Sequence, residues 1–250
     1  MDDQCRYVAL VTGATGGMGT AICKQLAKEG YRVVATYKTK EKADRWKKEM
    51  QELGFYFDDL YQVDVADFEA VGQMVQAIEQ QVGGIDVLVN SAGMTLDGQF
   101  RKMTFERWDM VIKVNLYGVF NCCRHVINPM IERGYGRIIN ISSISAQKGQ
   151  FGEVNYAAAK AGIHGLTKTL ALEVARKGIT VNTISPGYIA TDMVMAIPEE
   201  IRTKRILPEI PVGRFGSTEE VARLVAFLAS PESSFITGAN YTINGGHHMY

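Results

Sequence analysis

The chain has 250 residues, of which 46% are hydrophobic and 22% are charged. This composition is typical of a globular protein and excludes disordered and low-complexity classes. Basic and acidic residues number 27 each, so the formal net charge is zero, which argues against a nucleic-acid-binding protein. No apolar run approaches the ~20 residues of a membrane span, and the acidic residues 1–4 lack a signal-peptide pattern. We therefore expect a cytoplasmic protein with neither a nucleic-acid nor a membrane partner.

The four cysteines are Cys5, Cys23, Cys122 and Cys123. Two of them are adjacent, and none has the spacing to another cysteine or to a histidine that metal sites use. Cysteines of this kind are typical of reduced thiols in an intracellular protein. We expect no metal site.

Short apolar runs alternate along the chain with longer segments of helical periodicity. Residues 8–12 are apolar enough for a buried strand, and Met18, Ile22 and Leu26 then recur on one face of a helix. Strands without polar alternation, separated by helices, predict an α/β protein whose parallel sheet is covered on both faces. Further strands are expected near 32–36, 57–63, 86–90, 137–142, 180–184 and 240–243, and further helices near 41–53, 67–82, 104–133, 156–177 and 217–229.

No Pro/Ser-rich linker divides the chain, so residues 1–250 are predicted to form a single domain. One stretch, 191–214, breaks the rhythm with apolar residues, including Met193 and Met195, set among charges. Such a segment suits a mobile substrate lid. It is equally compatible with a helical excursion that packs on the core, and the sequence leaves both readings open.

A glycine-rich loop joins the first strand to the first helix. Residues 12–19 read Thr-Gly-Ala-Thr-Gly-Gly-Met-Gly. Glycines let a backbone approach a pyrophosphate closely, and the helix N-terminus offers amide donors and the positive end of its dipole. The alternative is a tight turn whose glycine serves helix–sheet packing. The strand–loop–helix setting favours a dinucleotide.

The spacing of this loop, Thr-Gly-x3-Gly-x-Gly, resembles the short-chain dehydrogenase/reductase family. Asn90-Ser91-Ala92-Gly93 after the fourth strand is similar to the family's Asn-Asn-Ala-Gly element, and Pro186-Gly187 follows the sixth strand as in the family. The resemblance covers nearly the whole chain. It implies a doubly wound, Rossmann-type domain with a seven-stranded parallel sheet in the order 3-2-1-4-5-6-7, a nicotinamide cofactor and a homotetramer.

The choice of cofactor can be argued from charge. A site for NAD places a carboxylate at the end of the second strand, to bind the ribose hydroxyls. Here Thr36, Tyr37 and Lys38 occupy that place, and Lys40 follows. We predict NADPH, because these lysines would attract a 2′-phosphate, although they could merely begin a solvated helix. The other predicted cofactor-binding residues are Gly13, Thr15, Gly16, Gly17, Met18, Gly19, Asp64, Val65, Asn90, Ala92, Gly93, Tyr156, Lys160, Pro186, Gly187, Ile189 and Thr191.

The predicted catalytic residues are Asn115, Ser143, Tyr156 and Lys160. Tyr156 and Lys160 are four residues apart and therefore share a helix face, although such a pair alone is common. Carbonyl reduction needs a proton donor and a second donor that stabilises the oxygen. We assign Tyr156 as general acid, with its pKa lowered by Lys160, and Ser143 as the oxyanion donor. Asn115 resembles the family residue that holds a water for proton relay.

The residues before Tyr156 narrow the substrate. The run 147–152, Gln-Lys-Gly-Gln-Phe-Gly, is similar to the acetoacetyl-CoA reductases of the family, which supply 3-hydroxybutyryl-CoA for polyhydroxyalkanoate synthesis. Glu153 stands where that resemblance predicts Gln. The expected reaction is reduction of acetoacetyl-CoA, a small-molecule acyl-CoA thioester, with NADPH. The predicted substrate-binding residues are Ser143, Gln150, Phe151, Tyr156 and Tyr188.

Two alternatives remain open on the sequence. A 3-oxoacyl-[acyl-carrier-protein] reductase would perform the same chemistry on a protein-borne substrate and would need a basic docking patch. Arg133, Arg176 and Lys177 are candidates for that patch. The second alternative is a non-catalytic dinucleotide-binding sensor, but such relatives usually lose the Tyr or the Lys, and both are present.

Overall fold

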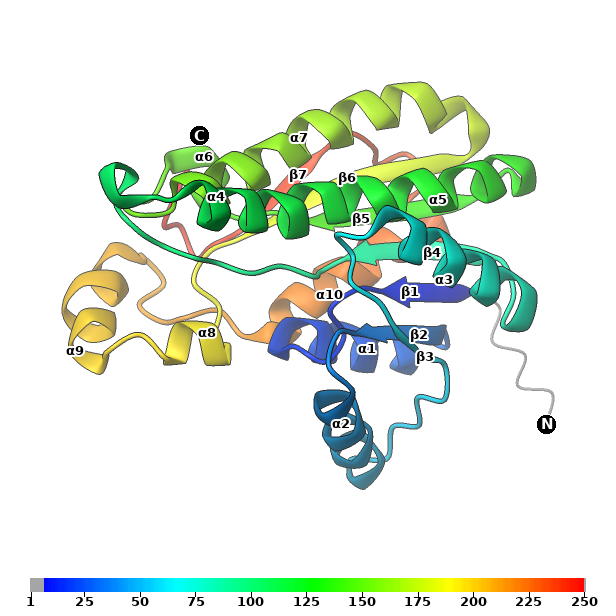
Figure 1. The fold of residues 1–250 in the computed structure, drawn as a ribbon, viewed down its shortest axis with the longest axis horizontal. Helices are drawn as coiled ribbons and strands as arrows, with labels where there is room; N and C mark the ends of the chain where they lie inside the picture. The colour runs from blue at the N-terminus through cyan, green and yellow to red at the C-terminus, as the bar shows by residue number, and fades with distance from the viewer. Residues whose placement is uncertain (1–6, 250) are drawn as a thin grey trace.

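The structure, a computed structural model, describes residues 7–249. Seven parallel strands form one sheet in the order β3-β2-β1-β4-β5-β6-β7 (Figure 1). The predicted fold class and strand order are therefore confirmed. The strands are β1 (Val8–Val11), β2 (Arg32–Tyr37), β3 (Leu60–Gln62), β4 (Ile85–Asn90), β5 (Gly136–Ile141), β6 (Ile179–Pro186) and β7 (Asn240–Ile243).

Helices cover both faces of the sheet, so each strand buries side chains on two sides. On one face α1 (Gly17–Lys28) and α10 (Thr218–Ala229) pack against each other and on the central strands, with α2 (Lys40–Glu52) beside them. On the other face lie α3 (Phe68–Gln81), α5 (Gly118–Arg133) and α7 (Val154–Val174). The two cores meet at β1, where Ala9 and Val11 face one layer and Leu10 faces the other.

Polar side chains fix where several helices begin. The Asp67 carboxylate accepts a hydrogen bond from the Ala70 amide at the start of α3, and the Thr104 hydroxyl accepts one from the Arg107 amide at the start of α4 (Phe105–Ile112). Ser217 forms the predicted capping box with Glu220 at α10. These interactions satisfy amides that have no partner within the helix.

The predicted long helix over 104–133 is interrupted. A π-helical turn, Lys113–Tyr117, separates α4 from α5 and contains Asn115. Such a turn inserts one extra residue into the helix and often marks a functional site. The predicted strand over 57–63 is also shorter than expected, because only Leu60–Gln62 pairs with β2.

The segment 191–214 is helical but lies apart from the two layers. It contains α8 (Asp192–Met195), α9 (Glu199–Ile201) and a second π-helical turn, Arg202–Ile206, and it projects beyond the carboxyl ends of the strands (Figure 1). Ile206 and Ile210 are buried, whereas Met193 and Met195 are about half exposed. Between residues 7 and 249 no helix is long and apolar enough to cross a membrane.

Candidate active site

A cavity of about 560 Å³ opens at the carboxyl ends of the strands. Ligands bind at this edge in open parallel sheets, because loops from neighbouring strands diverge there. The loops that follow β1, β2, β4, β5 and β6 all contribute to its walls. Predicted residues that line it are Gly13, Thr15, Gly16, Gly17, Met18, Gly19, Lys38, Asp64, Val65, Ala92, Gly93, Ser143, Gln150, Tyr156, Lys160, Pro186, Gly187, Tyr188, Ile189 and Thr191.

Two glycines of the glycine-rich loop, Gly13 and Gly19, pack without room for a side chain. Gly13 has a φ of +66°, and a Cβ there would lie 2.8 Å from the Cα of Ala92. A Cβ at Gly19 would lie 2.2 Å from the Gly13 carbonyl oxygen. No side chain caps the N-terminus of α1, so its first amides face the cavity with their dipole exposed. This cradle fits the pyrophosphate of a dinucleotide.

Two threonine hydroxyls hold this loop to its neighbours by hydrogen bonds with backbone amides. The Thr12 hydroxyl accepts hydrogen bonds from the amides of Ser91 and Ala92, both at 3.1 Å. The Thr36 hydroxyl accepts one from the Gly13 amide at 3.3 Å. The carboxyl ends of β1, β2 and β4 are thereby fixed relative to one another around the cavity.

The basic residues after β2 divide into two groups. Lys38 lines the cavity and forms an exposed ion pair with Asp64, 2.6 Å between Nζ and Oδ2. Burial raises the pKa of Asp64, but Lys38 and the hydrogen bond from the Ala66 amide together lower it, and the net direction is downward. Lys40, by contrast, lies outside the cavity, because it is on the first turn of α2 and faces solvent. Lys42, which the sequence analysis passed over, lines the cavity instead.

Asn90 and Asn115 lie behind the cavity wall rather than in it. Buried Asn90 donates to the Asn140 carboxamide oxygen at 2.8 Å, and Asn140 donates to Thr167 on α7 at 2.9 Å. Asn115 donates to the carbonyl oxygens of Val111 and Met94 and accepts from the Met94 amide. Both side chains therefore position elements around the site, and Asn90 does not reach the surface that a dinucleotide would contact.

Ser143, Tyr156 and Lys160 come together at one end of the cavity. Tyr156 and Lys160 lie on consecutive turns of α7, with Lys160 Nζ 5.6 Å from the centre of the Tyr156 ring. Lys160 is buried and donates to the Ile141 carbonyl oxygen at 2.8 Å. A hydrogen bond links Ser143, which follows β5, to Tyr156. The hydroxyls of Ser143 and Tyr156 thus lie together, and the ammonium group of Lys160 lies close to the Tyr156 ring.

Burial is the largest influence on the pKa values of Tyr156 and Lys160. It raises the pKa of Tyr156 above the usual value, and the nearby Glu153 carboxyl raises it further, whereas Ser143 lowers it. The expectation that Lys160 lowers this pKa towards neutrality is not met. Burial also lowers the pKa of Lys160 to about 8. The phenol is consequently neutral at physiological pH and still carries the proton that a general acid must donate.

The chain is similar over nearly its whole length to known reductases. The chain matches a family model described as enoyl-(acyl carrier protein) reductase over residues 13–248. It is 51% identical to acetoacetyl-CoA reductase from Cupriavidus necator and 52% identical to that from Rhizobium meliloti, each over 97% of this chain and 98% of the relative. A 3-oxoacyl-[acyl-carrier-protein] reductase from Staphylococcus aureus is 44% identical over 96% of this chain and 98% of its own length.

The chain belongs to the short-chain dehydrogenase/reductase family. It is therefore an oxidoreductase, and membership implies a nicotinamide dinucleotide cofactor, which the glycine cradle fits. No cluster of three His, Cys, Asp or Glu side chains that could hold a metal is found in the part of the chain that the structure describes. Cys23, Cys122 and Cys123 are buried free thiols, whereas Cys5 lies outside the described residues.

One predicted substrate-binding residue, Phe151, does not line the cavity. Gln150 and Tyr188 line the cavity, but Phe151 is 83% exposed and lies instead in a second, shallower hollow beside Phe100. The loop turns Phe151 outward, because Gly152 after it has a φ of +85° and its carbonyl oxygen accepts a hydrogen bond from the Gly98 amide. Further cavity residues that the prediction did not include are Thr36, Tyr37, Thr39, Ser91, Met94, Thr95, Val114, Glu153, Asp192 and Val194.

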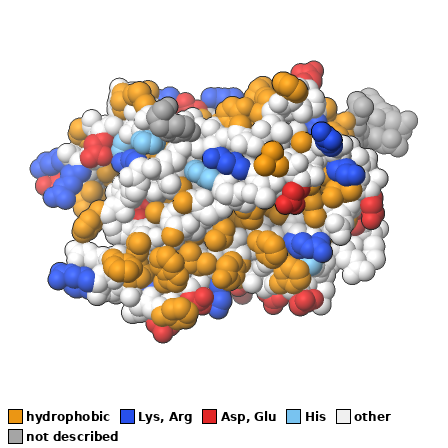
Figure 2. Space-filling model, turned by 90° about the horizontal axis from the view of Figure 1, so that it is seen from above, with side chains coloured by type: hydrophobic (Ala, Val, Ile, Leu, Met, Phe, Trp, Pro, Cys, Tyr) orange, Lys and Arg blue, Asp and Glu red, His pale blue; other side chains and the backbone are white. Residues whose placement is uncertain are grey.

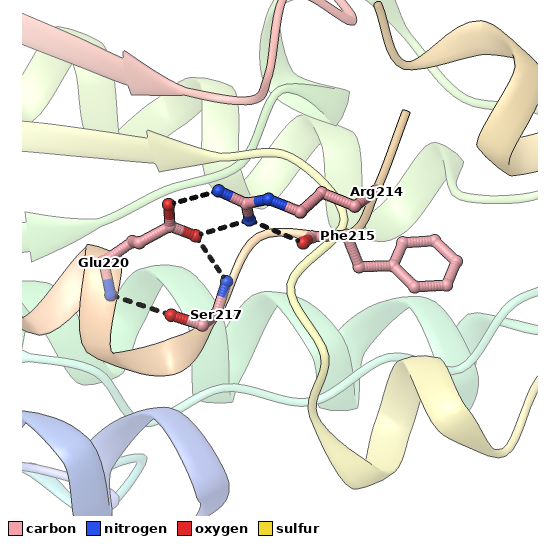
Figure 3. A network of polar contacts seen from close by, with 4 residues as sticks. All are labelled: Arg214, Phe215, Ser217 and Glu220. Atoms are coloured by element: carbon pink, nitrogen blue, oxygen red, sulfur yellow. Dashed lines mark hydrogen bonds and ion pairs between the residues drawn. The ribbon is translucent and has the colours of Figure 1, made fainter. Parts of the chain in front are cut away.

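Both ends of the segment 191–214 are held together beside this cavity. Ile189 pairs with Gly216 as a short parallel bridge. Arg214 then binds Glu220 through both of its terminal nitrogens, at 2.8 and 2.9 Å, while the same carboxylate accepts from the Ser217 amide (Figure 3). Arg214 and the Ser217 amide lower the pKa of Glu220 to about 2. The segment is thus a loop closed at its base, beside the cavity.

The three basic residues considered for carrier docking lie at the other edge of the sheet. Arg133 ends α5 and binds Glu79 and the Ile85 carbonyl oxygen. Arg176 and Lys177 form the turn before β6. All three precede the amino ends of strands, whereas the cavity lies at the carboxyl ends. An acyl carrier bound there is not beside the cavity of the same chain.

Proposed function

We propose that this chain reduces acetoacetyl-CoA to 3-hydroxybutyryl-CoA with NADPH. The observation that carries the proposal is the convergence of Ser143, Tyr156 and Lys160 in the same cavity as the glycine cradle. The relatives of about 50% identity that are named acetoacetyl-CoA reductase support the substrate.

Each residue of the site has a separate role in reduction of the ketone. NADPH, when bound, supplies a hydride to the ketone carbon. Negative charge then grows on the ketone oxygen, where Ser143 donates a hydrogen bond and Tyr156 donates the proton. Lys160 stabilises the phenolate that Tyr156 leaves behind and helps to hold the ribose. Asn115 acts indirectly, because it fixes the loop that contains Met94 and the helix beside it.

The preference for NADPH over NADH rests on charge at the end of β2. Lys38 and Lys42 line the cavity there, and β2 ends in Thr36 and Tyr37 without a carboxylate. A 2′-phosphate would be attracted by these lysines. Asp64 already pairs with Lys38, so we propose that Lys38 turns from Asp64 to the phosphate when NADPH binds.

We propose CoA rather than acyl carrier protein as the carrier. The basic residues suggested for carrier docking are remote from the cavity within the chain. The cavity mouth is bordered instead by the segment 191–214, which we propose closes over a short acyl-CoA thioester as a lid.

We further propose that four chains assemble into a homotetramer in the cytoplasm. The face that α4, α5 and α7 cover carries a band of hydrophobic side chains (Figure 2). Phe105, Met110, Tyr117 and Phe120 are all about half or more exposed there. A second apolar group, Phe227, Phe235 and Leu172, lies by α10, the loop before β7 and the end of α7. Exposed apolar groups of this kind are typical of surfaces that subunits bury when they assemble.

Turnover with matched substrates tests the proposal. Purified protein with NADPH should reduce acetoacetyl-CoA with a higher kcat/KM than acetoacetyl-acyl carrier protein. Tyr156→Phe should lower kcat by roughly 10²–10⁴-fold and leave the Kd for NADPH nearly unchanged, while Tyr56→Phe, on the exposed surface, should behave as wild type. Faster reduction of the carrier-protein substrate would favour the alternative, and turnover by Tyr156→Phe would refute the catalytic assignment.

A further inference from the structure

Trp46 is a buried aromatic residue on α2 that has no part in the reaction described above. Three side chains of α2 are buried, those of Ala43, Trp46 and Met50, and of these only the Trp46 indole carries an N–H donor. This N–H donates to the Thr20 hydroxyl on α1 at 2.8 Å. The indole ring also stacks on Phe57, with 5.1 Å between the ring centres. The hydrogen bond therefore fixes α2 to α1 at one defined point.

Thr20 connects Trp46 to the glycine-rich loop. The Thr20 hydroxyl oxygen lies 2.8 Å from the Gly16 carbonyl oxygen and 3.1 Å from that of Ala14. An indole N–H can only donate, so the Thr20 oxygen accepts from Trp46 and its own hydrogen is left for the two carbonyls. The indole thus determines the direction in which Thr20 donates.

The two carbonyls that Thr20 holds determine where the neighbouring amides point. In a trans peptide group the C=O and the N–H point in opposite directions. The oxygens of Ala14 and Gly16 face Thr20. The amides of Thr15 and Gly17, in the same two peptide groups, therefore point away from it, and both residues line the cavity. Amides attract a pyrophosphate, so Thr20 holds the loop in the form that binds an anion.

The position of α2 also determines where Lys42 lies. Lys42 is exposed, lines the cavity and precedes Trp46 by four residues, about one helical turn. In NADPH the pyrophosphate and the 2′-phosphate belong to the same nucleotide half, so both can be bound at once only if their two sites keep a fixed separation. The hydrogen bond between Trp46 and Thr20 joins the helix that carries Lys42 to the loop that fits the pyrophosphate.

We propose that Trp46 is a positioning residue for cofactor specificity, whose indole N–H holds α2 against the glycine-rich loop so that Lys42 can contact a 2′-phosphate. The inference rests on the proposed preference for NADPH. Loss of this N–H lets α2 shift relative to the loop and weakens the contact between Lys42 and the phosphate. NADH has a hydroxyl in place of that phosphate, so its binding changes less.

The test measures the Kd of NADPH and of NADH by calorimetry, without substrate, in wild type and Trp46→Phe. Phenylalanine keeps an aromatic ring against Phe57 but has no donor. The ratio of the Kd for NADH to the Kd for NADPH should fall roughly fivefold, as for the loss of one hydrogen bond. Trp108→Phe, on α4 outside the cavity, makes the same change at the other tryptophan of the chain and should keep the wild-type ratio.

Thr20 offers a second, independent set of variants. Thr20→Ser keeps the hydroxyl and should keep the wild-type ratio. Thr20→Val has a similar shape, but it neither accepts from Trp46 nor donates to the loop. It should therefore lower the ratio as Trp46→Phe does and also weaken the binding of NADH, because the pyrophosphate loop is released. Adding Trp46→Phe to Thr20→Val should lower the ratio no further, since both changes remove the same contact.

The outcomes separate this inference from the proposed function. A wild-type protein that binds NADH as tightly as NADPH would overturn the proposed cofactor and this inference with it. A wild type that prefers NADPH, together with a folded Trp46→Phe that keeps the full ratio, would overturn the role of Trp46 alone. Thermal unfolding checks that each variant is folded. If Trp46→Phe does not fold, equal ratios in Thr20→Val and Thr20→Ser would overturn the proposal.

Discussion

Lys38 is the exposed side chain on which the proposed preference for NADPH chiefly depends. Its ammonium group lies on the cavity wall within an ion pair that water screens, so it can exchange Asp64 for a phosphate at little cost. We expect Lys38→Ala to lower kcat/KM with NADPH by roughly tenfold, the equivalent of about 1.4 kcal/mol for a charged hydrogen bond, and to leave NADH unaffected. Lys48→Ala, exposed on α2, is the control. An equal loss with both cofactors would contradict the assignment.

Lys160 should leave a signature in the stability of the protein. Its pKa is lowered from 10.5 to about 8 by burial, so between these values the unfolded chain binds more protons than the folded one. Stability from this group therefore rises with pH across that window, by about 3 kcal/mol at most. We expect Lys160→Met to flatten the increase of Tm between pH 8 and 10.5, measured by calorimetry. Lys177→Met, at an exposed site, should keep the wild-type slope, and an unchanged slope in Lys160→Met would contradict this account.

At the scale of elements, the proposed lid 191–214 depends on how its base is held. Arg214 closes that base by its paired contacts with Glu220. We expect Arg214→Ala to raise KM for acetoacetyl-CoA several-fold, to speed proteolysis within 191–214 and to cost about 1 kcal/mol or less of stability, because the pair is partly exposed. Arg205→Ala removes the same charge from the tip and should not speed proteolysis. Unchanged KM and proteolysis in Arg214→Ala would exclude the lid.

The elements themselves could largely be predicted from the sequence, because apolar periodicity and capping residues are local signals. Asp67, Thr104 and Ser217 each begin a helix as expected. The π-helical turn at Asn115 could not be predicted, since it depends on hydrogen bonds from Asn115 to Met94, twenty-one residues earlier in the chain.

The site was predictable where the residues belong to regular elements and less so where they belong to loops. Tyr156 and Lys160 share a helix face by spacing alone. Phe151 lies in a loop whose direction is set by a contact with Gly98, and Lys40 faces outward on α2. Glu153 was noticed as an unusual residue, but its burial beside Tyr156 is a property of the packed structure.

For the whole molecule, the apolar band over α4 and α5 should govern assembly. Phe120, on α5, is 49% exposed. We expect Phe120→Glu to shift the protein from tetramers to smaller species in sedimentation velocity, because a charge would have to be desolvated in the contact. Tyr56→Glu, which places the same charge on another exposed aromatic residue, should not change the sedimentation. A tetramer that persists in Phe120→Glu would place the contact on another face.

The helix around Asn115 carries two otherwise independent attachments. Upstream, the Arg107 carbonyl accepts a hydrogen bond from Asn155, next to the general acid, and downstream Asn121 donates to the Val65 carbonyl beside the cofactor cradle. The π-helical turn between them accommodates one extra residue while the flanking turns keep nearly the same relative orientation. Excising one residue from the turn would therefore leave both attachments in place. The loss would fall instead on the two contacts by which Asn115 holds the backbone of Met94.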